Sequence, residues 1–241
     1  MADSPEIDSA RGWVVAFAGC AINTWTFGVF YAFATALEQM VAEFDANLSG
    51  IAAFFSVTVF LFFAVGIVAG PLADRYGARR LVAMGAIFMG GGLWLTAQVQ
   101  SLAAGILVYG LGVGLGIGSY LVPLNAATGA WFEKHRTLAL GVNTVGIGLG
   151  TLILVPVAEW LIRTAGWRSA FEAMGIGSFI VFGLVALVSF KPPTPRSPLS
   201  VSVLAVKRAV QRPEFWRLYL AGFFMSVALF IPFVFVVQYA K

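Results

Sequence analysis

Long apolar runs without a single charged residue set narrow limits on how this chain can fold. Residues 48–69 and 81–97 contain no Asp, Glu, Lys or Arg, whereas the turn between them, residues 70–80, holds one acid and three arginines. Hydrophobic residues make up 60% of the chain and charged residues 11%, against about 25% charged in soluble domains. Because about 20 apolar residues cross a bilayer as a helix, the sequence predicts an all-α membrane protein.

Seven membrane-spanning helices are expected along the chain. Helices satisfy their own backbone groups inside lipid, and the apolar runs are too long and too unalternating for the strands of a barrel. The first run follows the acidic residues Asp3, Glu6 and Asp8 and is too long for a signal peptide, so it is predicted to be a retained span. The expected ranges are about 12–37, 48–70, 81–98, 102–129, 137–160, 169–190 and 216–240.

The cations are distributed unevenly over the segments between these spans. Of the 15 Lys and Arg residues, 12 fall in the N-terminal tail and in the segments that follow the second, fourth and sixth spans. The loops at 38–47 and 99–101 contain none. By the positive-inside rule the cation-rich side faces the cytoplasm, and the N-terminus is expected there.

Several classes of function are excluded by composition. The chain has one cysteine, Cys20, and one histidine, His135, which excludes an internal disulfide and a histidine-cluster metal site. The net charge of +4 reflects loop cations in a membrane protein and does not indicate nucleic-acid binding. No nucleophile–base–acid set and no metal-ligand spacing are found, so neither an enzyme nor a cofactor is expected.

The turn at residues 70–80 has two interpretations. Three arginines between two spans are an ordinary topological stop signal. However, Asp74 contributes nothing to topology, and Gly70 and Gly77 bracket the turn at positions where glycine permits close approach or a positive φ. An acid among arginines suggests a specific ionic latch.

The same turn resembles a family signature. Its pattern, G-x-L-x-D-R-x-G-x-R-R, resembles the turn between spans two and three of the major facilitator superfamily. The resemblance implies a gating latch that joins the two halves of the carrier when the cytoplasmic side is closed. The implied latch residues are Gly70, Asp74, Arg75, Gly77, Arg79 and Arg80.

A second motif resembles one branch of that superfamily. Residues 131–141, WFEKHRTLALG, resemble the pattern that enters span five of monocarboxylate transporters, and Gly12-Trp13 opens span one as in that branch. Bacterial oxalate–formate antiporter-like proteins share it. The resemblance implies a bacterial inner-membrane carrier for a small organic anion, with or without a proton. Tyr31 stands where animal monocarboxylate transporters carry a lysine, and Tyr109 near the place of a common arginine.

The resemblance also implies a division of the chain. Facilitators have twelve spans in two six-span halves, and each half consists of two inverted three-helix repeats. Residues 1–11 are then a cytoplasmic tail, 12–190 the N-terminal six-helix half, 191–215 a cytoplasmic linker that begins Lys-Pro-Pro, and 216–241 the first helix of an incomplete C-terminal half. The chain is therefore expected to be a fragment, with the missing C-terminal half and the lipid bilayer as partners.

Candidate solute-binding residues are neutral, because the spans hold essentially no ionisable group. Asn23, Phe27 and Tyr31 recur every four residues on one face of the first span. Tyr120 and Asn143 are the polar candidates of spans four and five. Each of these residues either lines a cavity or joins helices by hydrogen bonds. Asn125 and Thr128 are expected at the cytoplasmic interface.

Glycine spacing and outer charges predict packing. Gly110, Gly114 and Gly118 form one four-residue ladder, and Gly112 and Gly116 form another about 200° away, so span four is expected to contact neighbours on two sides. At the outer end of spans five and six we expect an ion network that holds the turn, formed by Glu159, Arg163, Arg168 and Glu172.

Four functions remain open from sequence. The first is a secondary transporter of small organic anions that works by alternating access. The others are a facilitator for another solute, a seven-span receptor or retinal protein, and a non-transporting fragment. The seventh span lacks an internal lysine for a Schiff base, which weighs against a retinal protein.

Overall fold

The computed structural model describes residues 7–188, together with 211–217, 220–221 and 224. The chain divides into two compact units, Met1–Ser197 and Pro198–Lys241, and each is treated by itself. Most of the expected seventh span, and the linker before residue 211, lie outside the described residues. The helical bundle is formed by residues 7–188.

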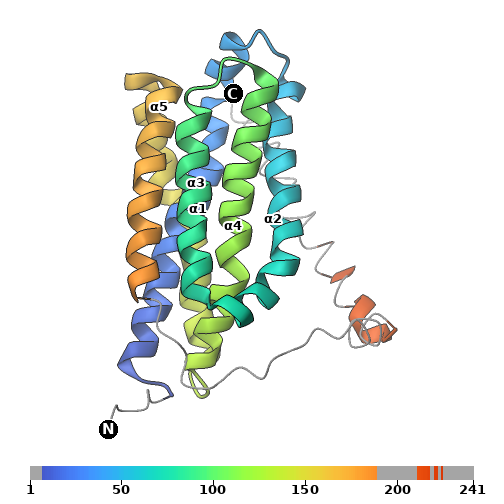
Figure 1. The fold of residues 1–241 in the computed structure, drawn as a ribbon, viewed down its shortest axis with the longest axis vertical. Helices are drawn as coiled ribbons and strands as arrows, with labels where there is room; N and C mark the ends of the chain where they lie inside the picture. The colour runs from blue at the N-terminus through green and yellow to red at the C-terminus, as the bar shows by residue number, and fades with distance from the viewer. Residues whose placement is uncertain (1–6, 189–210, 218–219, 222–223, 225–241) are drawn as a thin grey trace. The chain divides into compact units, whose positions relative to one another are not determined.

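Every secondary-structure element in residues 7–188 is a helix, which confirms the predicted all-α class. The helices are α1 (Ala10–Glu43), α2 (Leu48–Tyr76), α3 (Ala78–Thr96), α4 (Leu102–Trp131) and α5 (Arg136–Val188). The last of these reverses direction at Gly166, where φ is 82° and ψ is 160°. It therefore consists of a first limb, residues 136–165, and a second limb, residues 167–188, and these are the fifth and sixth predicted spans (Figure 1).

Four of the described helices are long and apolar enough to cross a membrane: Ala10–Glu43, Ala53–Tyr76, Leu102–Trp131 and Arg136–Val188. At 53 residues α5 is about 80 Å of helix, enough for two crossings of a 30 Å hydrocarbon layer. Large apolar side chains on the outside of the bundle remain exposed, including Phe60 (71%), Ile67 (79%) and Leu152 (72%). A surface this apolar is expected to face lipid tails and not water.

Most helices extend beyond the predicted span boundaries. The first span was expected to end near residue 37, yet α1 continues to Glu43. Residues such as Ala, Leu, Glu, Gln and Met favour helix regardless of whether lipid surrounds them, so helix length exceeds the apolar run. The starts are set by polar caps: Asn47 Oδ1 accepts from the backbone N–H of Gly50 (2.7 Å), and Ser101 Oγ accepts from that of Ala104 (3.4 Å).

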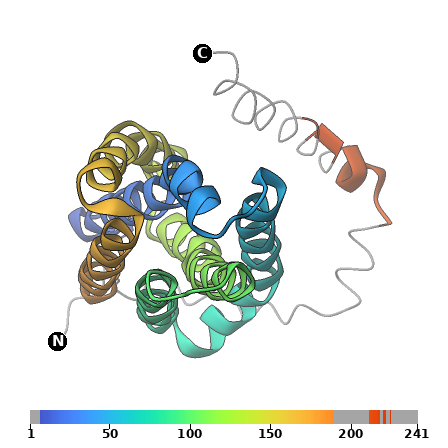
Figure 2. The ribbon, with the colours of Figure 1, turned by 90° about the horizontal axis from the view of Figure 1, so that it is seen from above.

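The two glycine faces of α4 contact two different helices, as predicted. Figure 2, which looks along the helices, shows α4 between α2 and α3. A side chain added to Gly110, Gly114 or Gly118 would meet Val57, Leu61 or Val65 of α2. A side chain added to Gly112 or Gly116 would instead meet Gly92 or Met89 of α3.

The close contacts have the symmetry expected of two inverted three-helix repeats. Just as α4 packs on α2 and α3, α1 packs on both limbs of α5. Gly146 and Gly150 of the first limb lie against the backbone oxygens of Cys20 and Thr24. The second limb meets α1 at Trp25, whose Nε1 donates to Ser178 Oγ (2.9 Å), and it also packs against α3.

The bundle has two ends of different charge. The end we call the basic end contains the start of α1, the α2–α3 turn and the α4–α5 turn, and it is the lower end in Figure 1. The opposite end contains the α1–α2 and α3–α4 loops and the reversal at Gly166.

Candidate functional site

Three of the predicted solute-binding residues form one hydrogen-bonded group between α1, α4 and α5. Tyr120 Oη donates to Asn23 Oδ1 (3.0 Å), and Asn23 Nδ2 donates to the backbone oxygen of Asn143 (2.9 Å). All three side chains are buried. We call them, with Asn125 and Thr128 below, the amide network.

Asn125 and Thr128 complete the amide network through Asn143. The Asn143 amide Nδ2 donates to Asn125 Oδ1 and to Thr128 Oγ1, both at 3.1 Å. The sequence led us to expect Asn125 and Thr128 near the cytoplasmic interface, which stays a prediction; within the bundle Thr128 is fully buried and Asn125 half-buried. Sequence reasoning missed their shared partner, although their i, i+3 spacing places the two polar groups on one face of α4.

Local geometry explains why an amide fits here. Gly19 of α1 has no side chain, and a Cβ at that position would overlap the Asn143 amide. Close approach of α1 and α5 at Gly146 brings Asn23 beside the backbone of Asn143. Because burying an amide without partners is costly, these mutual hydrogen bonds hold the polar groups inside an apolar bundle.

Phe27 and Tyr31 are not part of the amide network. They lie farther along α1 in an aromatic group with Phe30 and Phe55, where the ring centroids of Phe27 and Tyr31 are 6.2 Å apart and those of Phe30 and Phe55 are 4.6 Å apart. Phe27 is buried and Tyr31 is half-buried. Of the five predicted residues, Asn23, Tyr120 and Asn143 thus form a polar group, and Phe27 and Tyr31 belong to an aromatic group. The two groups are adjacent through Asn23 and Phe27 of α1.

The amide network can bind a solute by exchanging its own hydrogen bonds, or through Asn143 Oδ1, a buried acceptor without a hydrogen-bond partner among the described residues. It offers amide and hydroxyl donors and acceptors and carries no formal charge. In this structure the other groups of the network bond to one another, which is also how polar side chains join membrane helices. The structure is therefore compatible with either role for these residues, lining a cavity or joining helices.

The α2–α3 turn contains the predicted latch. Gly77 has φ 86°, a conformation that favours glycine, and it ends α2 and begins α3. Gly70 is different, because a Cβ there would make only an ordinary 4.0 Å contact with Val122. The charged latch residues Asp74, Arg75, Arg79 and Arg80 are exposed, and Arg75 lies 5.4 Å from the ring centroid of Tyr76.

The two segments that resemble monocarboxylate transporters contact each other at the basic end. The Trp13 and Phe132 rings are 4.9 Å apart, and Gly12 packs against Phe132. Asp8 accepts hydrogen bonds from the backbone N–H groups of Lys134 (3.1 Å) and His135 (3.3 Å). Although desolvation raises the pKa of Asp8, these backbone donors outweigh it and hold that pKa below its ordinary value.

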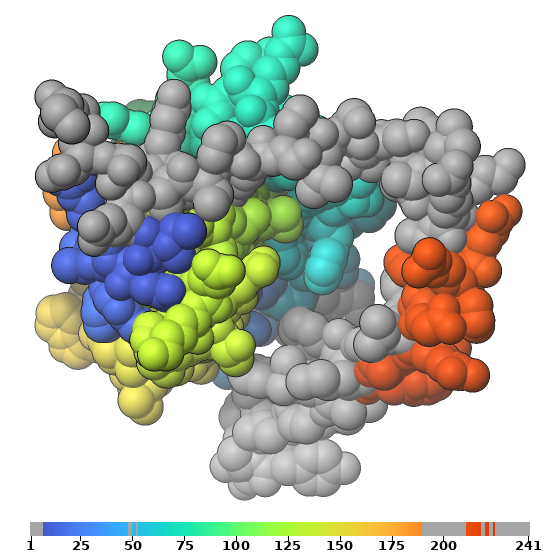
Figure 3. Space-filling model, turned by 90° about the horizontal axis from the view of Figure 1, so that it is seen from below, coloured from blue at the N-terminus to red at the C-terminus, as the bar shows by residue number. Residues whose placement is uncertain are grey.

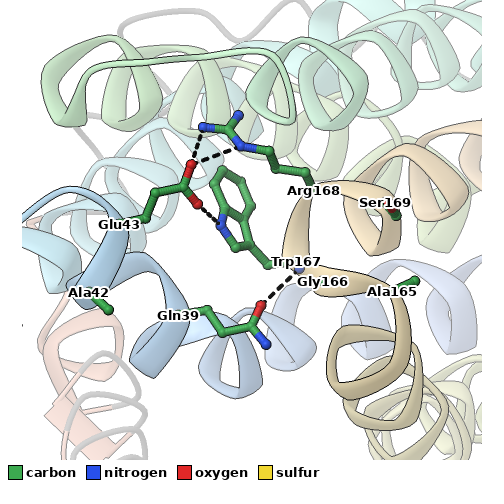
Figure 4. Close-up of a pocket in the computed structure, with 8 residues that line it drawn as sticks. All are labelled: Gln39, Ala42, Glu43, Ala165, Gly166, Trp167, Arg168 and Ser169. Carbon is green, nitrogen blue, oxygen red and sulfur yellow. Dashed lines mark hydrogen bonds and ion pairs between the residues drawn. The ribbon is translucent and has the colours of Figure 1, made fainter.

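A second polar group, which we call the clasp, lies at the opposite end around Gly166 (Figure 4). Gln39 bridges the reversal of α5: its amide Nε2 donates to the oxygen of Ile162 (3.1 Å) and its Oε1 accepts from the N–H of Trp167 (3.0 Å). Glu43 Oε1 accepts from Arg168 Nη2 (2.6 Å) and Nε (3.0 Å).

Arg168 also reaches the end of α3. Its guanidinium donates to the backbone oxygens of Val99 (2.7 Å) and Ala97, and it lies 4.5 Å from the ring centroid of Trp167. The clasp thus joins α1, α3 and the second limb of α5. Its polar groups bond to one another around an open depression in the surface, which favours a structural role.

The predicted outer ion network is not a single network. Arg163 pairs with Glu159 (3.6 Å), Arg168 with Glu43, and Glu172 accepts from Gln98 Nε2 (2.6 Å). The four expected charges therefore make three separate contacts, because Arg168 faces α1 and α3 while Arg163 faces along its own helix. Sequence reasoning missed Gln39 and Glu43. In residues 7–188 and the other described positions, no three His, Cys, Asp or Glu side chains gather as a metal site would need.

The comparisons with known proteins agree on one family. The family model described as Major Facilitator Superfamily matches residues 16–241. The chain is 32% identical over 186 residues to "Riboflavin transporter RibJ" of Trypanosoma brucei brucei, covering 74% of this chain and 33% of that protein. It is 28% identical over 239 residues to human "Monocarboxylate transporter 11", covering 97% of this chain and 50% of that protein.

A solved structure shows the same fold. A crystal structure of the peptide transporter POT, an E310Q mutant in complex with sulfate, matches with a TM-score of 0.65 at 18% identity, covering 95% of this chain and 48% of that one. The chain spans about a third to a half of the length of the two curated relatives. These relatives are transporters and not enzymes. The chain belongs to the major facilitator superfamily and is an integral membrane protein.

Proposed function

We propose that this chain is the N-terminal half of a secondary transporter that carries a small organic anion by alternating access. The observation that supports it most is the match to human monocarboxylate transporter 11 over 97% of the chain. The contact between Gly12-Trp13 and Trp131-Phe132 adds support, because both motifs resemble that branch. The bacterial origin expected from sequence stays a prediction, since both curated relatives are eukaryotic.

In this proposal the amide network is the polar part of the solute path. Asn23, Tyr120 and Asn143 hydrogen-bond one another while the path is closed at their level, and a solute carboxylate replaces those bonds when the halves rock apart. Phe27 and Tyr31 form the adjoining aromatic wall. A compensating cation is then supplied by the other half, since the amide network itself carries no charge.

The turn at residues 70–80 is proposed as the latch of the same carrier. Its four charged side chains are exposed at the basic end. Gly77, with its positive φ, ends α2 and lets α3 begin at the next residue. Exposed charges at this end lie where a second half can reach them, and the charges of the clasp bond within the bundle.

A second candidate is transport of a larger neutral or weakly polar solute. The match to a riboflavin transporter, at a higher identity than the match to the monocarboxylate transporter, favours it. Amides and hydroxyls suit the polar edge of a heterocycle as well as they suit a carboxylate.

The test is uptake by the full-length carrier in proteoliposomes, with lactate, formate and riboflavin compared as solutes. Tyr120→Phe removes one hydroxyl from the amide network, and we expect the KM of the transported solute to rise about fivefold, the equivalent of one hydrogen bond. Thr58→Val is the matched control, because Thr58 Oγ1 bonds only the Phe54 oxygen of its own helix (2.7 Å).

Two results would count against this function. Saturable uptake of riboflavin without uptake of either carboxylate would favour the second candidate. A Tyr120→Phe variant that loses thermal stability but keeps its KM would make the amide network helix-joining only.

Orientation is a further part of the proposal, with the basic end in the cytoplasm. Single cysteines at Ala78 and Ala46, in a Cys20→Ala background, are expected to react with a membrane-impermeant maleimide from opposite sides, Ala78 from the cytoplasm. The two positions lie at the basic and the opposite end of the bundle. Labelling of both from one side would contradict the span count, and labelling of Ala78 from the outside alone would contradict the orientation.

A further inference from the structure

Charge is strongly separated between the two ends of the bundle. Among residues 7–188 the basic end carries six Lys and Arg side chains and three carboxylates. The opposite end carries two arginines and five carboxylates. Figure 3 looks onto the basic end, where the start of α1 lies beside the α4–α5 turn; the α2–α3 turn belongs to the same end. The six cations are Arg11, Arg75, Arg79, Arg80, Lys134 and Arg136.

These six cations are exposed, and neither close ion pair among the described residues involves them. Both of those pairs, Arg163–Glu159 and Arg168–Glu43, lie at the opposite end. Of the three carboxylates at the basic end, Asp8 is directed to backbone N–H groups of the α4–α5 turn. Positive charge therefore stays on the surface of this end.

The cations stand directly beside lipid-facing apolar side chains. Arg11 precedes the exposed Val14 (44%) and Phe17 (61%) of α1 by three and six residues, and Arg136 precedes the exposed Leu138 (59%) by two. Tyr76, also exposed, lies next to Arg75. Tyrosine, lysine and arginine side chains are typical of helix ends that lie at the depth of the lipid headgroups. Here they stand at the border of the exposed apolar surface of the bundle, which we call the apolar belt.

We propose that the basic end is a docking surface for anionic lipid headgroups, which its cations hold at the border of the apolar belt. A headgroup phosphate is a constant neighbour at this depth, and a net negative charge on the lipid makes the contact more favourable at each exposed cation. The opposite end, with more carboxylates than arginines, lacks this preference. This surface does not depend on which solute is carried; it shares Arg75, Arg79 and Arg80 with the latch, whereas Arg11, Lys134 and Arg136 belong to the lipid surface alone.

The test measures lipid selectivity of the purified chain in nanodiscs of phosphatidylcholine with one fifth phosphatidylglycerol. A spin-labelled phosphatidylglycerol is compared with the equivalent phosphatidylcholine, and the ratio of their association constants is taken from the motionally restricted signal. We expect the parental chain to prefer phosphatidylglycerol. Each neutralised cation is expected to lower that preference by up to about fivefold at low salt.

The variants are chosen outside the latch. Arg11→Gln and Lys134→Gln remove one basic-end charge each, and Lys134→Arg keeps it. Arg163→Gln removes a comparable exposed charge at the opposite end and is expected to leave selectivity unchanged. Raising the salt concentration should reduce the parental preference, because exposed charges are screened.

Three results would overturn the proposal. They are a parental chain without preference for phosphatidylglycerol, an equal loss in Arg163→Gln and Lys134→Gln, and a preference that salt does not reduce. In any of these cases the cations of the basic end serve to orient the chain during membrane insertion, or they contact another protein segment. The parental salt titration and Lys134→Arg remain informative even if the neutral variants fold poorly.

Discussion

Gly92→Ala is expected to lower the free energy of unfolding by about 3 kcal/mol, a large loss for the addition of a single methyl group. A Cβ at Gly92 would overlap the backbone of Gly112, and a Cβ at Gly112 would overlap that of Gly92. Backbone atoms cannot turn aside as a side chain does, so α3 and α4 must separate along their contact. That separation loses the packing of Met89 against Gly116 on the same face.

The adjacent glycine is a matched control. Gly91 lies in the same helix, and a Cβ there meets nothing within 4 Å. Because alanine favours helix over glycine, Gly91→Ala should leave stability unchanged or raise it by up to about 1 kcal/mol. Unfolding of both variants in mixed SDS–detergent micelles measures the difference. Equal stability of the two variants would mean that α3 and α4 are not in close contact.

The glycine faces of α4 were predictable because they are a property of one helix. A four-residue spacing of Gly110, Gly114 and Gly118 defines a face whatever lies opposite it, and a second ladder on another side requires a second neighbour. The same holds for the spans, since apolar length alone decides whether a segment crosses lipid. The turn at Gly166 was also foreseen, because two separate apolar runs flank it.

Partners between helices could not be predicted in this way. Asn143 was a candidate from its residue type, yet its bonds to Asn125 and Thr128 depend on how α5 is rotated against α4. Gln39 and Trp167 are 128 residues apart, and their hydrogen bond depends on where α1 ends relative to the reversal of α5. Sequence periodicity gives the face of each helix but not the register between two helices.

The ends of the helices were predicted less well than the spans, because folded structure continues beyond the apolar runs. Glu43 was assigned to a loop because charged residues lie outside the apolar run, but α1 continues past that run and brings Glu43 to Arg168. Asp8 was assigned to a tail, although its carboxylate joins the α4–α5 turn. Polar residues just beyond a span can therefore belong to the folded bundle.

Arg168→Gln is expected to destabilise the bundle by about 1–2 kcal/mol, after allowance for the partial exposure of the pair. The side chains of Arg168 and Glu43 are 33% and 41% exposed, so water screens their attraction. Much of the effect comes from the backbone oxygens of Ala97 and Val99 at the end of α3, which lose their donor. Unfolding in mixed SDS–detergent micelles, with the parental chain alongside, measures the loss.

Two matched variants separate geometry from charge. Arg163→Gln removes a charge of the same sign five residues before Arg168. Arg163 makes an exposed i, i+4 pair with Glu159 (3.6 Å), so we expect the free energy of unfolding to fall by at most about 0.5 kcal/mol. Arg168→Lys keeps the charge but cannot donate to Glu43 and to two carbonyls at once, because an ammonium lacks the planar fork of a guanidinium. It should therefore recover only part of the stability. If Arg168→Lys matched the parental chain, or Arg163→Gln matched Arg168→Gln, net charge at this end would explain the stability, and the clasp between α1, α3 and the second limb of α5 would not.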